Sequence, residues 1–382
     1  MAEQIPDCLI VGGGVIGLSL ALELSRHGAS VTLVEKGAIG KEASWAGAGL
    51  LPPANPDHSF EPQERLRGLS HQLFPQWSAW LREQTGIDNE FEVCGGVYVA
   101  RDIGEAASLA SAMFQYEEEG VRVEKLTQVE LLTMLPGLSA EIPYRSAYSL
   151  PDEAVVRNPR HLKALKTACQ MQGVRLVPET EVQCFTLGQQ RITGVETNQG
   201  TFTGSQVALC AGSWTQLLSD LLFEQLGLAN EIQRPEIEPI RGQMLLFHTG
   251  ETILLSCPVN EGPRYLVPRR DGHLLVGSTV EEAGFDKSNT PEAIEDLQQF
   301  AFSLLPALRE AQLIQAWSGL RPASLDRIPY IGRIPGIENA FLAAGHYRSG
   351  LHLSPATAQL LAQLMRGETP QIDLAPFRLD RG

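Results

Sequence analysis

The stretch Gly12-Gly13-Gly14-Val15-Ile16-Gly17 has the spacing G-x-G-x-x-G and decides the fold of this chain. It follows an apolar run at residues 8–11, which is typical of a buried parallel strand, and precedes apolar residues at helical spacing over 16–27. A second apolar run at residues 31–34 leads directly into the acidic Glu35. Strand, glycine turn, helix, strand and acid in this order predict a Rossmann-like unit that binds a dinucleotide.

The glycines and the acid have separate physical roles in such a unit. Gly12 permits the tight turn, Gly14 lets the backbone approach a pyrophosphate, and Gly17 lets helix and strand pack closely. The helix N-terminus attracts the phosphates, and Glu35 accepts hydrogen bonds from ribose hydroxyls. The charge of Glu35 would repel a 2′-phosphate, which disfavours NADP. Two alternatives stay open: a glycine-rich turn without a ligand, and NAD rather than FAD.

Composition narrows the class of protein. The chain has 382 residues, which suggests two domains, and its 43% apolar and 20% charged content is that of a globular protein. Its formal net charge of -15 disfavours nucleic acid as a partner. The six cysteines and eight histidines show no metal-ligand spacing, so we expect reduced thiols and no metal. Residues 1–7 carry no Lys or Arg before the apolar run, which argues against a secretory signal. We expect a soluble, cytoplasmic protein that does not bind membranes.

Further strand-like segments suggest how the fold continues. Apolar runs at 174–177, 207–210 and 341–344 resemble buried strands, and alternating segments over 181–203 and 239–279 predict antiparallel strands. We therefore expect an α/β fold: a Rossmann-like domain interleaved with an antiparallel-sheet substrate domain of α+β type. The first domain is expected at 1–85, 145–215 and 310–382, and the second at 86–144 and 216–309. Helices are expected at 66–84, 106–119, 127–132, 158–172, 290–305 and 354–365, and a strand pair at 91–100 around Gly95-Gly96.

Later segments carry a family resemblance. The small-residue loop at 44–51 and the stretches 209–214 and 239–243 belong to it. The most specific matches are Trp317-Ser318-Gly319-Leu320-Arg321-Pro322, Pro329-Tyr330-Ile331-Gly332 and Ala344-Gly345-His346-Tyr347-Arg348-Ser349-Gly350. In this collinear order, which spans residues 6–365, the chain resembles the D-amino-acid oxidase superfamily of flavoproteins, and within it the bacterial glycine oxidases.

The resemblance implies noncovalent FAD as the cofactor. Monomeric sarcosine oxidase attaches its flavin to a cysteine, and Gly319 stands at the matching position in a segment, 258–382, that lacks cysteine. The expected cofactor-binding residues are the glycines of the motif together with the residues whose flavin contacts the resemblance implies. They are Gly12, Gly14, Val15, Ile16, Gly17, Glu35, Lys36, Ala43, Ser44, Ala48, Gly49, Leu50, Val182, His346, Tyr347, Arg348, Ser349, Gly350, Leu351 and His352.

Three residues are expected to bind and orient the substrate. Arg321 matches the arginine that binds the substrate carboxylate, and Tyr265 and Arg348 match other substrate-facing positions. Arginine suits this task because its guanidinium is planar, always charged and bidentate. The alternatives are a structural ion pair for Arg321, a core tyrosine at 265 and a solvated surface arginine at 348. Val280 stands where the family has a pocket methionine, which leaves the fine substrate preference open.

The implied reaction is oxidative deamination of glycine, and also of sarcosine or small D-amino acids. The products are a 2-oxo acid (glyoxylate from glycine), ammonia or an amine, and H2O2, with hydride transfer to flavin N5 and O2 as the oxidant. A helix N-terminus near residues 350–354 would stabilise the negative charge of reduced flavin. A role in thiamine biosynthesis and a homotetramer are implied by the resemblance alone. Two alternatives remain: a D-amino-acid dehydrogenase that reduces a quinone, and a flavin-binding subunit of a heteromeric amine oxidase.

Overall fold

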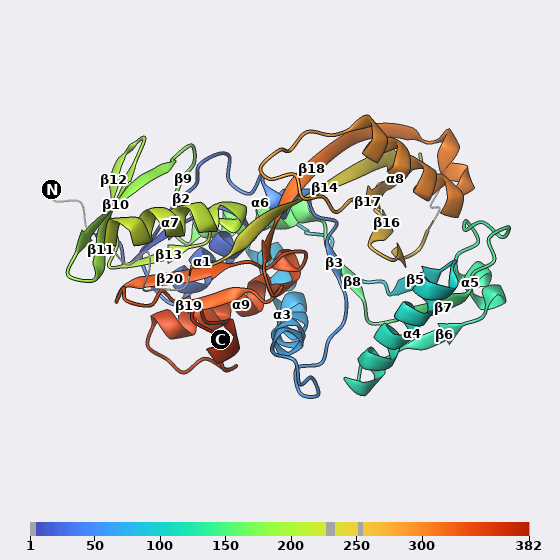
Figure 1. Cartoon of the computed structure of the whole chain (residues 1–382), viewed down its shortest axis with the longest axis horizontal. Helices are drawn as coiled ribbons and strands as arrows, with labels where there is room; N and C mark the ends of the chain where they lie inside the picture. The colour runs from blue at the N-terminus through green and yellow to red at the C-terminus, as the bar shows by residue number, and fades with distance from the viewer. Residues whose placement is uncertain (1–4, 227–233, 251–254, 382) are drawn as a thin grey trace.

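A six-stranded sheet at the centre of one half of the molecule contains the strand that leads into the glycine motif. The computed structural model describes residues 5–226, 234–250 and 255–381, so the parts of the expected domain segments at 1–4, 227–233, 251–254 and 382 lie outside the described residues. Figure 1 shows this sheet in the left half and a second large sheet in the right half. In spatial order, its strands are β19 Tyr330–Arg333, β20 Ala340–Ala344, β13 Gln206–Leu209, β1 Cys8–Val11, β2 Val31–Val34 and β9 Arg175–Val177.

The predicted Rossmann-like unit is confirmed. β1 pairs in parallel with β2 and β13, and all four of its residues are buried. Helix α1 (Val15–Arg26) begins inside the motif. A side-chain carbon at Gly17 would overlap the carbonyl oxygen of Gly12, so only glycine lets α1 approach the turn this closely.

Alternation along these strands places apolar side chains on both faces of the sheet. Ile10 and Leu33 pack with the helices α1, α3, α6 and α9, whereas Leu9 and Val34 pack under α7 and the meander β10–β12. The sheet is therefore buried on both sides, as its continuous apolar strands predict. The helices are α2 Ala43–Ala46, α3 Pro62–Thr85, α4 Ile103–Glu118, α5 Gln128–Met134, α6 Asn158–Met171, α7 Thr215–Leu226, α8 Pro291–Leu304 and α9 Gly350–Met365.

The second large sheet has eight strands within the described residues and is mostly antiparallel. Its α8-facing side carries Leu245, Val276 and Leu266, which pack against Leu297 and Phe300 of that helix. The opposite side is left for the site described below. In spatial order, its strands are β18 Gln312–Ser324, β14 Ile237–His248, β17 His273–Gly277, β16 Arg264–Pro268, β15 Val259–Glu261, β5 Gly96–Ala100, β7 Ser146–Leu150 and β6 Glu124–Leu126.

Two small sheets complete the described strands. The predicted meander over 181–203 is confirmed as an antiparallel sheet, and a second small sheet joins three two-residue strands. Among the described residues, no helix combines the length and the apolar character that crossing a bilayer requires. The strands of the two sheets are β10 Val182–Gly188, β11 Arg191–Thr197 and β12 Gly200–Phe202, and β3 Leu50–Leu51, β8 Ala154–Val155 and β4 Glu92–Val93.

Two expectations for the secondary structure are wrong. The expected strand pair at 91–100 does not form, because β4 pairs with β8 while β5 pairs with β7 and β15. The last helix begins at Gly350 rather than 354, with Pro355 inside it. Proline favours the first helical turn, which is why 354–355 resembled a start. Here the hydroxyl of Ser354 donates to the carbonyl of Leu351, the group that the missing N–H of Pro355 would otherwise have bonded.

We predict that Gly17→Ala lowers the free energy of unfolding by about 2 kcal/mol or more, because the added methyl group overpacks the contact between α1 and the turn. Urea unfolding at saturating FAD measures the change.

A suitable control is Gly104→Ala, in the first turn of α4, where the added carbon meets only the Asp102 carboxylate at 3.4 Å. This substitution should be neutral or stabilising by up to about 1 kcal/mol, since alanine favours helix. Equal stability of the Gly17→Ala and Gly104→Ala proteins would contradict the packing role of Gly17.

Candidate active site

One cavity of about 1000 Å³ is lined by residues from both large sheets. It contains every residue expected to bind cofactor or substrate except Gly17, which lies outside the lining and packs against Gly12 instead. The expected residues that the cavity brings together are Gly12, Gly14, Val15, Ile16, Glu35, Lys36, Ala43, Ser44, Ala48, Gly49, Leu50, Val182, Tyr265, Arg321, His346, Tyr347, Arg348, Ser349, Gly350, Leu351 and His352.

At one end of the cavity lies the start of α1. No side chain caps this helix at Gly14, and its first turn contains no acid, so its N-terminal partial positive charge faces the cavity. The backbone N–H of Val15 donates to the hydroxyl of Ser44 at 2.9 Å. The carboxylate of Glu35 accepts from the N–H of Gly13 at 2.6 Å and of Gly37 at 3.1 Å, which fixes the acid beside the turn.

The segment expected as a small-residue loop at 44–51 contains part of the short helix α2 (Ala43–Ala46), and three side chains hold the loop from this helix to Leu50 in place. Asn158 donates to the carbonyl of Ser44 at 2.9 Å, and Trp317 donates to the carbonyl of Ala46 at 3.1 Å. Arg269 donates to the carbonyl of Ala48, and burial lowers the pKa of its guanidinium to about 10. Sequence reasoning missed Asn158 and Arg269. The only signal for Asn158 was its place before Pro159, which indicates a helix start and nothing more.

The start of α9 forms another wall. Ser349 at its N-cap makes no side-chain cap, and the first turn has no acid, so this N-terminus also directs partial positive charge into the cavity. His346 is hydrogen-bonded to Thr357 at 3.1 Å, and burial lowers its pKa to about 3. Burial likewise lowers the pKa of His352, and neither ring nitrogen of His352 has a partner among the described residues. Both histidines are therefore neutral.

The eight-stranded sheet forms the floor of the cavity, and two glycines clear space on it. A side chain at Gly242 would collide with the guanidinium of Arg321, and one at Gly277 would lie 2.7 Å from the ring of Tyr265. β14, which carries Gly242, pairs on one side with β17, which carries Gly277, and on the other side with β18, which carries Arg321. The motif around Arg321 was recognised in the sequence, but the strand that contains this residue, β18, was not predicted. The structure therefore places Arg321 and Tyr265 on one face of the sheet, above Gly242 and Gly277, where a larger residue would collide with them.

Arg321 is held by neutral acceptors. Its guanidinium donates to the carbonyls of Arg241 at 3.3 Å and Thr279 at 3.1 Å, and to the hydroxyl of Ser278 at 2.6 Å. Within the described parts of the chain, it lies in no ion pair with a carboxylate. Burial lowers the pKa of Arg321; the phenol of Tyr265 opposes this effect, and the charge of Arg348 adds to it. The alternative of a structural ion pair is therefore wrong for the described residues.

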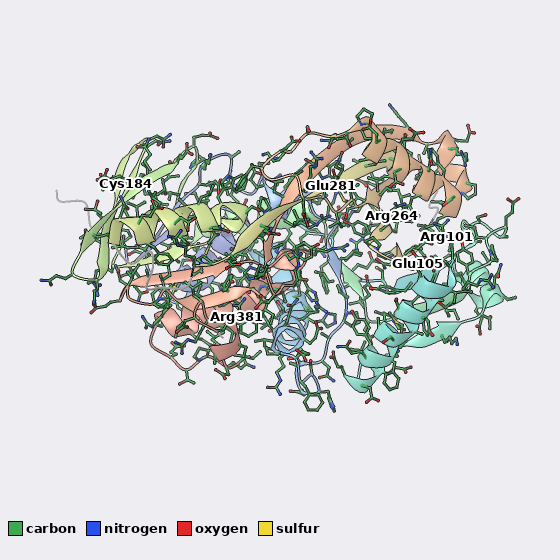
Figure 2. All side chains as sticks on the ribbon, in the orientation of Figure 1. Arg101, Glu105, Cys184, Arg264, Glu281 and Arg381 are labelled. Carbon is green, nitrogen blue, oxygen red and sulfur yellow. The ribbon has the colours of Figure 1, made fainter. Side chains whose placement is uncertain are left out.

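The neighbouring Arg241 provides the contrast. It lies on the other face of β14 and pairs with Glu281 at 2.6 Å and Asp286 at 2.7 Å. Glu281 is labelled in Figure 2. The nearby acids thus bind Arg241 and leave Arg321 with a full positive charge toward the cavity. A partly buried cation with only neutral partners favours an anion beside it.

The other substrate-facing candidates differ in exposure. Tyr265 is 7% exposed, and its hydroxyl donates to the sulfur of Met244 at 3.3 Å, a weak acceptor. Arg348 is exposed and donates to the carbonyl of Pro263 at 3.0 Å while lining the cavity. The expectation that Val280 occupies a pocket position is wrong, because this side chain is 49% exposed and lies outside the lining. Met244 lines the cavity instead.

These features fit FAD. Two uncapped helix N-termini suit anionic groups at separate places in one cavity, and Glu35 suits a ribose. The buried amide oxygen of Asn158 and both nitrogens of His352 lack partners among the described residues and remain available to a ligand. In the same residues, no cluster of three or more potential metal ligands occurs.

Comparisons with known proteins agree with the geometry. Residues 7–364 match the family model described as FAD dependent oxidoreductase. The chain is 39% identical to a glycine oxidase of Pseudomonas aeruginosa, over 99% of this chain and 98% of that one. It is 31% identical to a bifunctional protein ThiO/ThiG of Trichormus variabilis, over 98% of this chain and 55% of that one. The crystal structure of glycine oxidase from Geobacillus kaustophilus superimposes with a TM-score of 0.90 at 32% identity, over 99% of both chains. The chain therefore belongs to the family of FAD-dependent oxidoreductases.

Proposed function

We propose that this protein is a glycine oxidase that uses noncovalent FAD to deaminate glycine, and also sarcosine or small D-amino acids, with O2 as the oxidant. The observation that carries the proposal is the partly buried Arg321, which lines the cavity without a carboxylate partner among the described residues. The names of the glycine oxidases that it resembles over almost the whole chain support the choice of substrate.

Arg321 binds the substrate carboxylate in this proposal. Its fixed guanidinium donates two parallel hydrogen bonds, while the hydroxyl of Tyr265, which otherwise donates to the weakly accepting sulfur of Met244, donates a third. Arg348, which is exposed and lines the same cavity, adds positive charge that attracts the substrate carboxylate. Holding the carboxylate fixes the position of the Cα–H and amine that react.

FAD would be held by the two uncapped helix N-termini, Glu35 and the loop at residues 43–50. When bound, it would supply the acceptor for a hydride from the substrate Cα and for return of the electrons to O2 as H2O2. The start of α9 stabilises negative charge at that wall of the cavity. Water then hydrolyses the substrate imine to glyoxylate and ammonia.

The remaining expectations belong to the same proposal. We assign the six-stranded sheet to the FAD-binding domain and the eight-stranded sheet to the substrate domain. β7 and β18, at 146–150 and 312–324, pair in the second sheet although the expected segments 145–215 and 310–382 assign them to the first domain. A cytoplasmic location, a homotetramer and a role in thiamine biosynthesis are proposed from the family resemblance.

We predict that the purified protein forms one H2O2 per glycine consumed when O2 is the only electron acceptor. Coupled peroxide and ammonia assays measure the ratio. Reduction of a quinone or dye by glycine without peroxide would favour the dehydrogenase alternative, and a yellow protein inert to every small amino acid would favour the subunit alternative.

We further predict that Arg321→Ala raises KM for glycine about 100-fold or more, because two charge-assisted hydrogen bonds to the carboxylate are lost. Steady-state kinetics at saturating FAD measures the change.

The matched control is Arg264→Ala. Arg264 precedes Tyr265 on β16 but points to the other face, where it pairs with Asp296 at 2.8 Å; it is labelled in Figure 2. Its loss should change KM less than about threefold, as an exposed ion pair contributes little. Unchanged KM in Arg321→Ala would contradict the carboxylate site.

A further inference from the structure

A row of polar side chains crosses the cavity floor away from Arg321. Asn260 of β15 is in register with Tyr265 of β16 on one side and with Tyr98 of β5 on the other. Residues in register on neighbouring strands point to the same face, and all three line the cavity. Because strands lie about 4.8 Å apart, Tyr98 stands roughly 10 Å from Tyr265. The floor therefore continues sideways, well beyond the reach of glycine.

The row ends at Glu153, between β7 and β8, a fully buried carboxyl that also lines the cavity. The hydroxyl of Tyr98 donates to its Oε2 at 2.6 Å. Its Oε1 has no hydrogen-bond partner among the described residues. Arg67, on the same cavity, pairs with Glu64 at 2.7 Å instead. A buried polar atom without a partner is uncommon in proteins, so Oε1 marks the place of a ligand group.

The charge of Glu153 restricts the kind of ligand group. Burial raises the pKa of this carboxyl to about 7, against the opposing effect of the hydrogen bond from Tyr98. Near neutral pH, a large fraction of the carboxyl is therefore uncharged. A hydroxyl group can donate to the ionised form and accept from the neutral form, so it matches Glu153 in both states. An ammonium group matches only the ionised form.

We propose that Tyr98, Asn260 and Glu153, the distal arm, bind a hydroxyl group at the far end of amino-acid substrates longer than glycine. The proposal rests on the proposed function, because Arg321 must hold the carboxylate. A chain of five bonds between the carboxylate carbon and the hydroxyl oxygen spans about 6 Å, and a hydrogen bond of about 3 Å at each end extends its reach to about 12 Å, somewhat more than the roughly 10 Å between Tyr265 and Tyr98.

Two ligands without an amine test the distal arm without turnover. 2-(2-Hydroxyethoxy)acetate and propoxyacetate have the same length and differ by a hydroxyl in place of a methyl group. Titration calorimetry with the FAD-loaded protein should show about three- to tenfold tighter binding of the hydroxyl ligand, the value of one net hydrogen bond. In Glu153→Leu this preference should vanish or reverse, while methoxyacetate, which is too short for the arm, binds within about twofold of the wild-type affinity.

The neighbouring acid provides a matched control. Asp152 lies one residue away but pairs with Arg122 at 3.0 Å and lies outside the cavity lining, so Asp152→Asn should keep the full preference. If Glu153→Leu does not fold, Tyr98→Phe replaces it, and the loss of the orienting hydroxyl should reduce the preference at least about twofold.

Equal binding of the two long ligands by the wild-type protein, or a preference that survives both substitutions, would overturn the distal arm. A hydroxyl preference that depends on Glu153 in a protein that forms no peroxide from glycine would uphold the arm and refute the glycine oxidase proposal. Failure of all three carboxylates to bind would refute both the arm and the role of Arg321.

Discussion

A partly buried guanidinium that has no acidic partner among the described residues is the constraint on which the rest of the site depends. Burial of an unpaired charge is unfavourable by several kcal/mol unless hydrogen bonds and a counter-ion compensate. Arg321 obtains its hydrogen bonds from two carbonyls and the hydroxyl of Ser278, whereas the nearby acids Glu281 and Asp286 pair with Arg241. We propose that the missing counter-ion is the carboxylate of a small amino-acid substrate.

The two large sheets serve this site in different ways. The six-stranded sheet brings the starts of α1 and α9 to one cavity, where their partial charges suit an anionic cofactor. The eight-stranded sheet supplies a floor whose glycines, Gly242 and Gly277, leave room for Arg321 and Tyr265. Strands thus carry two of the three side chains proposed to face the substrate, Arg321 and Tyr265, which favours a fixed geometry for reaction.

Much of this arrangement follows from short-range patterns in the sequence. The turn at 12–17 predicted its strand–helix–strand unit because glycine, apolar period and acid all act locally, and Glu35 lies where that pattern requires. The family motifs located Arg321 on the cavity, but its strand was missed. Asn158, Arg269 and Glu153 could not be found, because their roles depend on contacts between segments far apart in the chain. Val280 was misplaced as well: Ser278 and Thr279 just before it accept hydrogen bonds from Arg321, but its own side chain is 49% exposed and lies outside the cavity lining.

The most direct test of the central claim is rapid anaerobic mixing of the FAD-loaded protein with glycine and, separately, with methylamine, which lacks the carboxylate. Because Arg321 must hold a carboxylate before the Cα–H can react, glycine should bleach the flavin absorbance fully within one turnover and methylamine should leave it unchanged. Flavin that stays oxidised with glycine, sarcosine and small D-amino acids, or that is bleached equally fast by methylamine, would contradict the account.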